Sequence, residues 1–227
     1  MIKLENVVLA SPEQMNFVIE GMRNPMNSWG KSDSHNCKQN SSFCVECECN
    51  KIGYRLGEND ISLMQRLSNA GTEHRKYMRM MPVYVRITAP LYWWKEFDTY
   101  KVGTVANSCS TMHKIAEKGF TLGDFSIEHL NDDRSAELSN VEWLEHLIHH
   151  LNRDRLRFIK TKDKQYWWQM IQLLPSSYNQ TRNVMLNYEV LANIYRQRKN
   201  HKLDEWREVC KWIESLPYSE LITGEEE

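Results

Sequence analysis

The chain has 227 residues, a length that suits one large domain or two small ones. Its 29 lysine and arginine residues nearly balance its 30 aspartate and glutamate residues, so no global field would attract a nucleic acid or an anionic membrane. Because no apolar run reaches the roughly 18 residues of a membrane-spanning helix and the N-terminus lacks signal-peptide features, we expect a cytoplasmic protein with no membrane or nucleic-acid partner.

The N-terminal quarter predicts a strand, a helix and a long polar insert. Residues 2–9 alternate weakly between apolar and polar side chains, as strands do. Ser11-Pro12-Glu13-Gln14 combines a capping box with proline at the first helical position, so a helix should run from there to Met22. Residues 23–57 are rich in Asn, Ser and Cys and show no regular period, so order in this insert would need a metal, a partner or packing against the rest of the protein.

The middle of the chain predicts a helix, a strand and a short aromatic helix. Asn59-Asp60 can cap a helix that extends to Met81, with an interruption at Ala70-Gly71. Residues 83–88 alternate as a half-buried strand does. The strand should end at Ala89-Pro90, where the proline begins the short aromatic helix.

The C-terminal half is largely helical. Apolar residues recur at helical spacing in four segments, which are residues 140–158, 162–174, 180–198 and 202–214. Residues 224–227 form an acidic tail that should be frayed. Together these elements predict a single α+β domain over residues 1–227.

Cysteines in the polar insert have the spacing of candidate metal ligands. A Cys-x2-Cys pair places two thiolates at a separation that suits tetrahedral Zn²⁺. The insert contains such a pair together with further cysteines, so the candidate ligands are Cys37, Cys44, Cys47 and Cys49. Two interpretations remain open, a structural zinc site and free thiols, because the second pair is not a clean Cys-x2-Cys. A reducing compartment favours thiols over disulfides for all six cysteines.

Two charged helix surfaces have both a functional and a simpler interpretation. His146, His149 and His150 do not reproduce the metalloprotease spacing, so we interpret them as a solvated helix face. Residues 153–164 are basic and precede Trp167-Trp168, a combination that could neutralise and stack a single strand of nucleic acid. A solvated surface explains the same residues, and we favour it.

Two polar runs contain the residues that we expect to form a ligand site. Residues 98–113 offer hydroxyl, amide and amino groups suited to a phosphate, a sugar or a base edge. Within them Gly103 permits a close backbone approach, and Lys101 supplies a cation. In the second run, residues 195–206, the guanidinium of Arg198 can donate two parallel hydrogen bonds to one ligand group. A polar surface loop and a charged helix end are the simpler interpretations.

The order and spacing of these runs resemble the flavin-dependent thymidylate synthase family. That family has a strand ending in an Ala-Pro turn, then a polar segment with Arg-His-Arg and Glu-x-Ser-x-Arg, and later a Leu-Pro followed by a helix with Asn and Arg residues. Here Ala89-Pro90 begins one ungapped match and Leu174-Pro175 begins another. The resemblance implies the α+β fold of that family, with antiparallel strands packed against a largely helical C-terminal half.

In the first match the resemblance implies cofactor-binding and substrate-binding positions. The family's Arg-His-Arg, which meets the flavin, falls on residues that keep one positive charge: Thr99, Tyr100 and Lys101. The family's Gln and its nucleotide-binding Glu, Ser and Arg fall on residues of other types: Glu96, Asn107, Cys109 and Thr111. Each lost arginine removes a charge-assisted contact of about 1.5 to 3 kcal/mol.

In the second match the resemblance implies further ligand contacts. Asn187 and Asn193 match family asparagines near the flavin, and Arg198 falls on the arginine that binds and polarises the pyrimidine. His201 matches the family histidine after a one-residue deletion. Asn187 and Arg198 are eleven residues apart, close to three helical turns, so we expect them to point the same way.

The resemblance implies an enzyme that binds FAD and a pyrimidine deoxynucleotide as a homotetramer and transfers a one-carbon unit to deoxyuridine monophosphate. In that chemistry NADPH supplies a hydride through the flavin and methylenetetrahydrofolate supplies the carbon. Arg198 would then be the catalytic residue, with a second role in substrate binding. The lost arginines leave an alternative open, a non-catalytic protein that keeps the fold and binds or sequesters a nucleotide.

Overall fold

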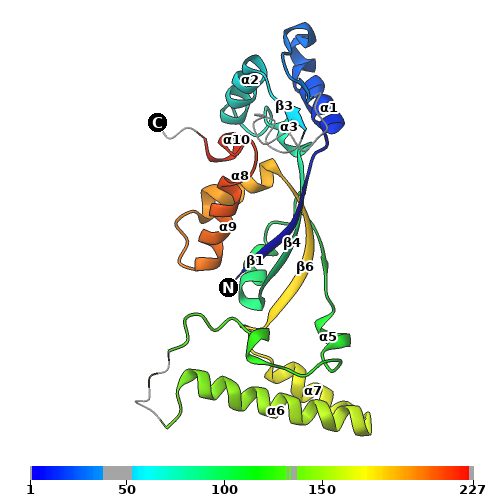
Figure 1. The fold of residues 1–227 in the computed structure, drawn as a ribbon, viewed down its shortest axis with the longest axis vertical. Helices are drawn as coiled ribbons and strands as arrows, with labels where there is room; N and C mark the ends of the chain where they lie inside the picture. The colour runs from blue at the N-terminus through cyan, green and yellow to red at the C-terminus, as the bar shows by residue number, and fades with distance from the viewer. Residues whose placement is uncertain (1, 38–52, 132, 134–136, 225–227) are drawn as a thin grey trace. The chain divides into compact units, whose positions relative to one another are not determined.

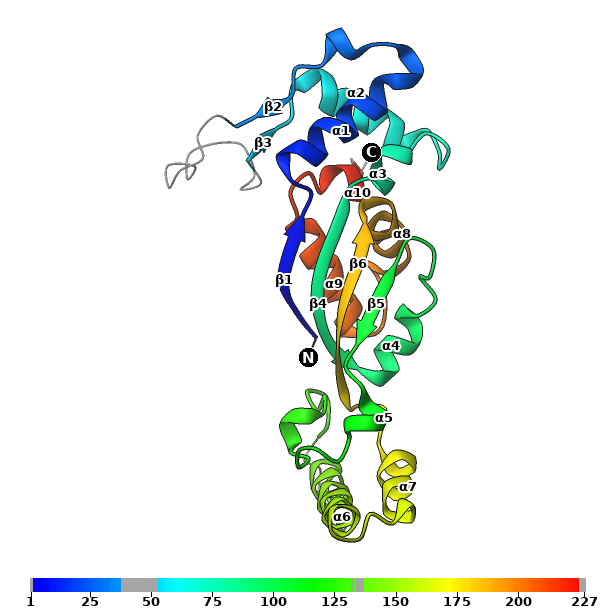
Figure 2. The same cartoon turned by 90° about the vertical axis from the view of Figure 1, so that its right-hand side faces the viewer.

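The computed structural model describes residues 2–37, 53–131, 133 and 137–224 (Figure 1). The main sheet has the strand order β1 (Lys3–Leu9), β4 (Pro82–Pro90), β6 (Asn179–Asn187) and β5 (Val105–Ser108). Neighbouring strands of this sheet run antiparallel (Figure 2). Among the described residues, no helix has the length and apolar character needed to cross a membrane. The mixture of helices with an antiparallel sheet confirms the α+β class.

The chain groups into two compact units, each assembled from separate segments. One unit comprises Met1–Lys3, Ile87–Thr99 and Asn107–Asn183, and the other comprises Leu4–Arg86, Tyr100–Ala106 and Val184–Glu227. We call them the first and second unit. The organisation of the chain as a single domain remains a prediction.

The N-terminal part of the second unit contains the predicted helix, followed by short elements that the sequence did not predict. Helix α1 (Pro12–Arg23) begins with the predicted capping box, in which the Gln14 backbone amide donates to Ser11 Oγ and the Ser11 amide donates to Gln14 Oε1 at 2.8 Å. Two short 3-10 turns follow at Asn24–Met26 and Trp29–Lys31. A two-stranded antiparallel ribbon pairs β2 (His35–Asn36) with β3 (Tyr54–Arg55).

The helix predicted over residues 59–81 is interrupted, as expected at Ala70-Gly71. Helix α2 (Glu58–Asn69) ends there, Gly71 has φ +120°, and α3 (Lys76–Arg79) follows. The predicted cap at Asn59-Asp60 is wrong, because Gly57 is the N-cap residue. Asp60 instead lies fully buried inside the helix.

Asp60 joins three segments of the second unit through its carboxylate. Arg23 Nε donates to Asp60 Oδ1 at 2.6 Å, and the Ser32 and Ser34 hydroxyls donate to Oδ2 at 2.7 and 2.6 Å. Burial raises the pKa of Asp60, but the hydrogen bonds from Ser34, Ser32 and Arg23 outweigh it and hold the pKa below its usual range. The ionised form of Asp60 is therefore favoured in the folded protein, although it is removed from water.

The first unit contains the aromatic helix and a long helical hairpin. Pro90 is the N-cap of α4 (Leu91–Phe97), as predicted, and α5 (Thr111–Lys114) is a single turn. Helices α6 (Asn140–Thr161) and α7 (Lys164–Leu173) pack side by side, near a 3-10 turn at Leu122–Asp124. Their shared core consists of Ile115, Phe120, Phe125, Leu144, Ile148, Leu151 and Met170. His146, His149 and His150 are exposed on α6, which confirms the solvated face.

The segment predicted as one helix over residues 180–198 is a strand followed by a helix. Residues 179–187 form β6, and α8 (Tyr188–Arg198) begins only after them. Asn187 is the N-cap residue, with its Oδ1 accepting from the Val190 amide at 3.0 Å. Helix α9 (Asp204–Glu214) and the short α10 (Glu220–Thr223) pack with α8 in the second unit (Figure 1).

Candidate functional site

The C-terminal end of α8 carries a guanidinium group enclosed by aromatic side chains. Arg198 Nε donates to the Tyr100 hydroxyl at 3.0 Å, and Arg198 Cζ lies 4.8 Å from the ring centroid of Trp206. The Tyr100 and Trp206 rings meet edge to face with centroids 5.9 Å apart. Trp206 is fully buried, so it fixes one wall of the cluster. Arg198 is therefore held in one orientation before any ligand arrives.

Two further side chains complete this cluster. The Tyr100 hydroxyl donates to Gln197 Oε1 at 2.9 Å. His201 lies edge to face with Trp206, and its Nδ1 accepts from the Leu203 amide at 3.2 Å. Because Nδ1 is an acceptor, a neutral His201 carries its proton on Nε2. The structure thus brings together Tyr100, Arg198 and His201, which the sequence placed in two separate runs.

The loop of residues 100–106 approaches the beginning of α8 closely. Gly103 has φ +77°, and a Cβ added there would lie 2.9 Å from Asn187 Nδ2 and 3.1 Å from Val190 Cγ2. Only glycine tolerates this approach, as the sequence predicted. Next to it, the Thr104 Oγ1 atom is buried and has no hydrogen-bond partner among the residues that the structure describes. Lys101 is exposed in the same loop.

Asn187 and Arg198 do not form one compact contact. Asn187 precedes the first residue of α8 and Arg198 is its last residue, so eleven residues at 1.5 Å each separate them by about 16 Å along the axis. Asn187 is also largely buried and occupied with capping the helix. Asn193 lies between them and accepts from Arg196 Nη2 at 2.7 Å. A ligand that meets both ends of α8 must therefore be extended.

In the first unit, the sequence did not identify Arg182 as a site residue. Its guanidinium Cζ lies 4.1 Å from the ring centroid of the buried Trp94, and Nη1 is 2.6 Å from Asp98 Oδ1. Arg182 Nε also donates to Gln180 Oε1 at 2.9 Å. The Gln180 amide in turn donates to Thr111 Oγ1 at 2.9 Å. The guanidinium of Arg182 is therefore connected to the Thr111 hydroxyl through a single side chain, that of Gln180.

The remaining predicted substrate positions also belong to the first unit. Asn107 and Cys109 are exposed, and the Cys109 carbonyl accepts from Gln180 Nε2 at 3.1 Å. Glu96 is half-buried, and its carbonyl accepts from the exposed Thr99 hydroxyl at 2.7 Å. Cys109 and Thr111 are thus joined through Gln180. The assignment of these residues to a nucleotide remains a prediction.

The proposed zinc ligands lie mostly outside the described residues. Cys44, Cys47 and Cys49 belong to the segment 38–52, and only Cys37 is described. Elsewhere in the described chain, no group of at least three His, Cys, Asp or Glu side chains could hold a metal ion. The zinc site stays a prediction.

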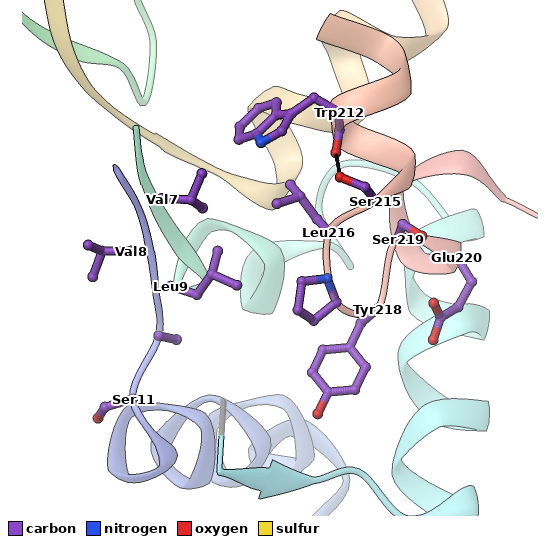
Figure 3. A pocket seen from close by; sticks show the side chains of 12 residues that line it. Val7, Val8, Leu9, Ser11, Trp212, Ser215, Leu216, Tyr218, Ser219 and Glu220 are labelled. Carbon is purple, nitrogen blue, oxygen red and sulfur yellow. Dashed lines mark hydrogen bonds between the residues drawn. The ribbon is translucent and has the colours of Figure 1, made fainter. Parts of the chain in front are cut away.

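A cavity of about 890 Å³ lies in the second unit at the end of β1 (Figure 3). Val7, Leu9 and Ser11 line one side of it, and the segment from Trp212 to Glu220 lines the other. Leu216 lies beside Ser215 in this wall, and the Tyr218 ring extends away from that serine (Figure 3). None of the predicted site residues lines this cavity, so it is separate from the Arg198 cluster.

Comparisons with known proteins identify the fold. No protein-family model matches the sequence, and no curated protein matches it in sequence. Thymidylate synthase X (ThyX) from Helicobacter pylori, solved with FAD and dUMP, superposes with a TM-score of 0.65 at 16% identity, covering 99% of this chain and 98% of that one. PolB, a UMP/dUMP methylase from Streptomyces cacaoi solved with 5-Br UMP, gives 0.60 at 11% identity, covering 98% of this chain and 94% of PolB.

The class defined by these matches is the ThyX-like α+β fold. The resemblance inferred from the Ala89-Pro90 and Leu174-Pro175 matches is confirmed at the level of the fold, which extends over nearly the whole chain. This chain has the fold of the flavin-dependent thymidylate synthases, and at such low identity the likeness establishes the fold alone.

Proposed function

We propose that this protein binds FAD and a pyrimidine deoxynucleotide, and that it transfers a one-carbon unit to deoxyuridine monophosphate. One observation carries the proposal. Arg198 falls on the position that the resemblance assigns to the pyrimidine-binding arginine, and it is held there by Tyr100 and Trp206. The fold match to ThyX with FAD and dUMP and to the methylase PolB supports the same class of ligands.

The residues of the 100–106 loop fit a phosphate-bearing cofactor such as FAD. Thr104 Oγ1 is a buried polar atom without a partner among the described residues, and such an atom is costly unless something else satisfies it. Lys101, three residues before Thr104 in the same loop, is exposed and supplies a positive charge. We infer that Lys101 and Thr104 would hold the cofactor, with Asn193 and His201 on the α8 side. When bound, the flavin would supply hydride-transfer chemistry.

Arg198 would act on the pyrimidine by donating hydrogen bonds to a base carbonyl. Charge that develops on that oxygen is stabilised most effectively by a donor that is already oriented. Trp206 and Tyr100 orient Arg198 and exclude water from one face of its guanidinium. Tyr100 would therefore be a positioning residue, because its hydroxyl already bonds with Arg198 and Gln197.

Arg182 offers a replacement for a charge that the sequence lacks. The family's nucleotide-binding arginine falls on Thr111, which carries no charge. Arg182 reaches the Thr111 hydroxyl through Gln180 and is packed on Trp94. We propose that Arg182 supplies the positive group for the nucleotide phosphate, together with Glu96, Asn107 and Cys109 as neighbouring polar contacts.

A non-catalytic nucleotide-binding protein is the second candidate. The observation that favours it is the loss of charge along the first match, where the Arg-His-Arg positions are Thr99, Tyr100 and Lys101. A protein that has Arg198 but keeps only the charge of Lys101 at these positions could bind a nucleotide tightly without turnover. We further propose NADPH and methylenetetrahydrofolate as co-substrates of an active enzyme, a homotetrameric assembly and a cytoplasmic location.

The absorbance spectrum of purified protein, before and after loading with FAD, tests the proposal. Flavin bands that remain after removal of excess FAD, and a melting temperature that rises with dUMP, would support it. NADPH oxidation that depends on dUMP and methylenetetrahydrofolate would separate the enzyme from the binding protein. Protein that cannot be loaded with FAD and does not respond to dUMP would refute both candidates.

A further inference from the structure

The exposed face of α6 carries a row of basic and histidine side chains. Side chains that recur every three or four residues lie on one face of a helix. On α6 such a row consists of the exposed residues His146, His150, Arg153, Arg157 and Lys160. We call these five residues the basic row. It lies on the opposite side of the helix from the buried Leu144, Ile148 and Leu151, and it extends over about 21 Å of the helix axis.

The acidic residues next to the basic row do not balance its charge. Residues 153–164 contain six lysine or arginine residues and two aspartates, whereas the whole chain has a net charge of −1. Asp154 is buried, and its carboxylate is shared between Arg153 Nε at 3.4 Å and Arg157 Nη1 at 3.7 Å. The second aspartate, Asp163, caps the beginning of α7. A local positive field therefore remains on this face, although the chain as a whole has none.

Aromatic rings of α7 lie next to these positive charges. Arg157, a member of the basic row, has its Cζ atom 5.6 Å from the ring centroid of Tyr166. Lys164 Nζ lies 5.7 Å from the ring centroid of Trp168, which is 43% exposed. Trp168 also meets Trp167 edge to face, with centroids 4.8 Å apart, so its ring is supported by a neighbour. Exposed rings beside cations are the combination that stacks bases and neutralises phosphates.

We propose that the basic row and Lys164 bind the phosphates of a single-stranded nucleic acid, and that Trp168 stacks on one of its bases. A single strand fits this face because its bases are open to stacking, whereas a duplex hides them. An anionic membrane fits less well, because a membrane-surface helix has apolar residues at the centre of its exposed face. Here that centre is basic, and the exposed Leu156 and Ile159 lie between the basic row and the buried face.

The sequence alone favoured a solvated surface for residues 153–164. The structure adds the shared face of α6 and the contacts between its cations and the rings of α7. The proposal is independent of the assignments of FAD and dUMP.

The test is the fluorescence anisotropy of a labelled oligo(dT) of about 15 nucleotides titrated with the purified full-length chain. The logarithm of Kd should rise with the logarithm of the salt concentration by about 0.7 for each phosphate contacted. Three contacts would therefore raise Kd roughly 20-fold between about 50 and about 200 mM salt. Absence of binding at the lower salt concentration would overturn the proposal.

Two variants separate the phosphate contacts from the stacking. Lys160→Gln combined with Lys164→Gln leaves both partners of Asp154 in place, so it should fold normally, raise Kd about ten-fold or more and lower the salt slope by about 1.4. Trp168→Ala should raise Kd about five-fold or more and leave the salt slope unchanged, and Trp168→Phe should restore most of the affinity. Melting temperatures of all variants, measured in parallel, show that they are folded.

The matched control is Lys95→Gln combined with Lys202→Gln, which removes two exposed charges away from α6 and α7 and should bind oligo(dT) like the wild type. If the Lys160 and Lys164 variant also binds like the wild type, the proposal is wrong. Equal affinity for a duplex of the same length would refute the preference for a single strand. Displacement of oligo(dT) by dUMP would place it in the nucleotide site instead. Binding to phosphatidylserine vesicles without binding to oligo(dT) would assign the face to a membrane and overturn the proposal.

Discussion

Replacing Arg198 by alanine should weaken the binding of dUMP without unfolding the protein. A charge-assisted hydrogen bond contributes about 1.5 to 3 kcal/mol, which corresponds to an increase in Kd of roughly 10- to 150-fold. The same change removes the Nε to Tyr100 hydrogen bond of 3.0 Å and the packing against Trp206. Because Arg198 is only half-buried, those losses should cost about 1 kcal/mol of stability.

The assay is isothermal titration of dUMP into protein loaded with FAD, with the melting temperature of each variant measured in parallel. Arg198→Lys keeps the charge but loses the planar fork, so its Kd should fall between the wild type and Arg198→Ala. Lys202→Ala, which removes an exposed charge just beyond α8, is the control and should bind dUMP normally. If Arg198→Ala binds dUMP as tightly as the wild type, the assignment of the pyrimidine site to the end of α8 is wrong.

Four further perturbations test the fold and the site. Asp60→Asn should lower the free energy of unfolding by about 3 to 5 kcal/mol at neutral pH. Because the pKa of Asp60 is lowered in the folded protein, its contribution to stability is complete above the unfolded-state pKa of about 3.9 and is lost as the pH falls through the folded-state pKa. Acid unfolding, monitored by circular dichroism, should therefore depend less on pH in the variant than in the wild type. Alkylation of the exposed Cys109, followed by peptide mass spectrometry, should slow when dUMP is added, and equal rates would remove Cys109 from the nucleotide site. Gly103→Ala should destabilise the protein by about 1 to 3 kcal/mol in chemical denaturation, because φ is +77° and the new Cβ would lie 2.9 Å from Asn187 Nδ2. Arg182→Gln should raise the Kd for dUMP about ten-fold or more, and unchanged binding would show that Arg182 does not replace the missing arginine.

Short sequence motifs correctly predicted the helix starts that depend on a few adjacent residues. The capping box at Ser11 and the proline at the beginning of α4 each depend on a few adjacent residues, and both are where the sequence placed them. Strand β5 was missed because all four of its residues are exposed, so no alternation of apolar side chains marks it. Strand β6 was read as helix because its pairing with β4 and β5 outweighs the weak local pattern.

The site was predictable to the extent that its residues lie in two recognisable runs. Arg198, Tyr100 and His201 were found because the spacing of a known family pointed to them, and the structure brings them around Trp206. Arg182 escaped notice because its partners Trp94 and Asp98 precede it by more than eighty residues.

The contact between Gly103 and the cap of α8 makes ligand binding and helix stability thermodynamically linked. The loop that carries Lys101 and Thr104 touches Asn187, which holds the first turn of α8 in place. A ligand that binds the loop and fixes it against Asn187 should also slow the fraying of that turn, and a weakened cap should in turn lower the affinity for that ligand. Amide hydrogen exchange at the start of α8 should therefore report occupancy of the loop.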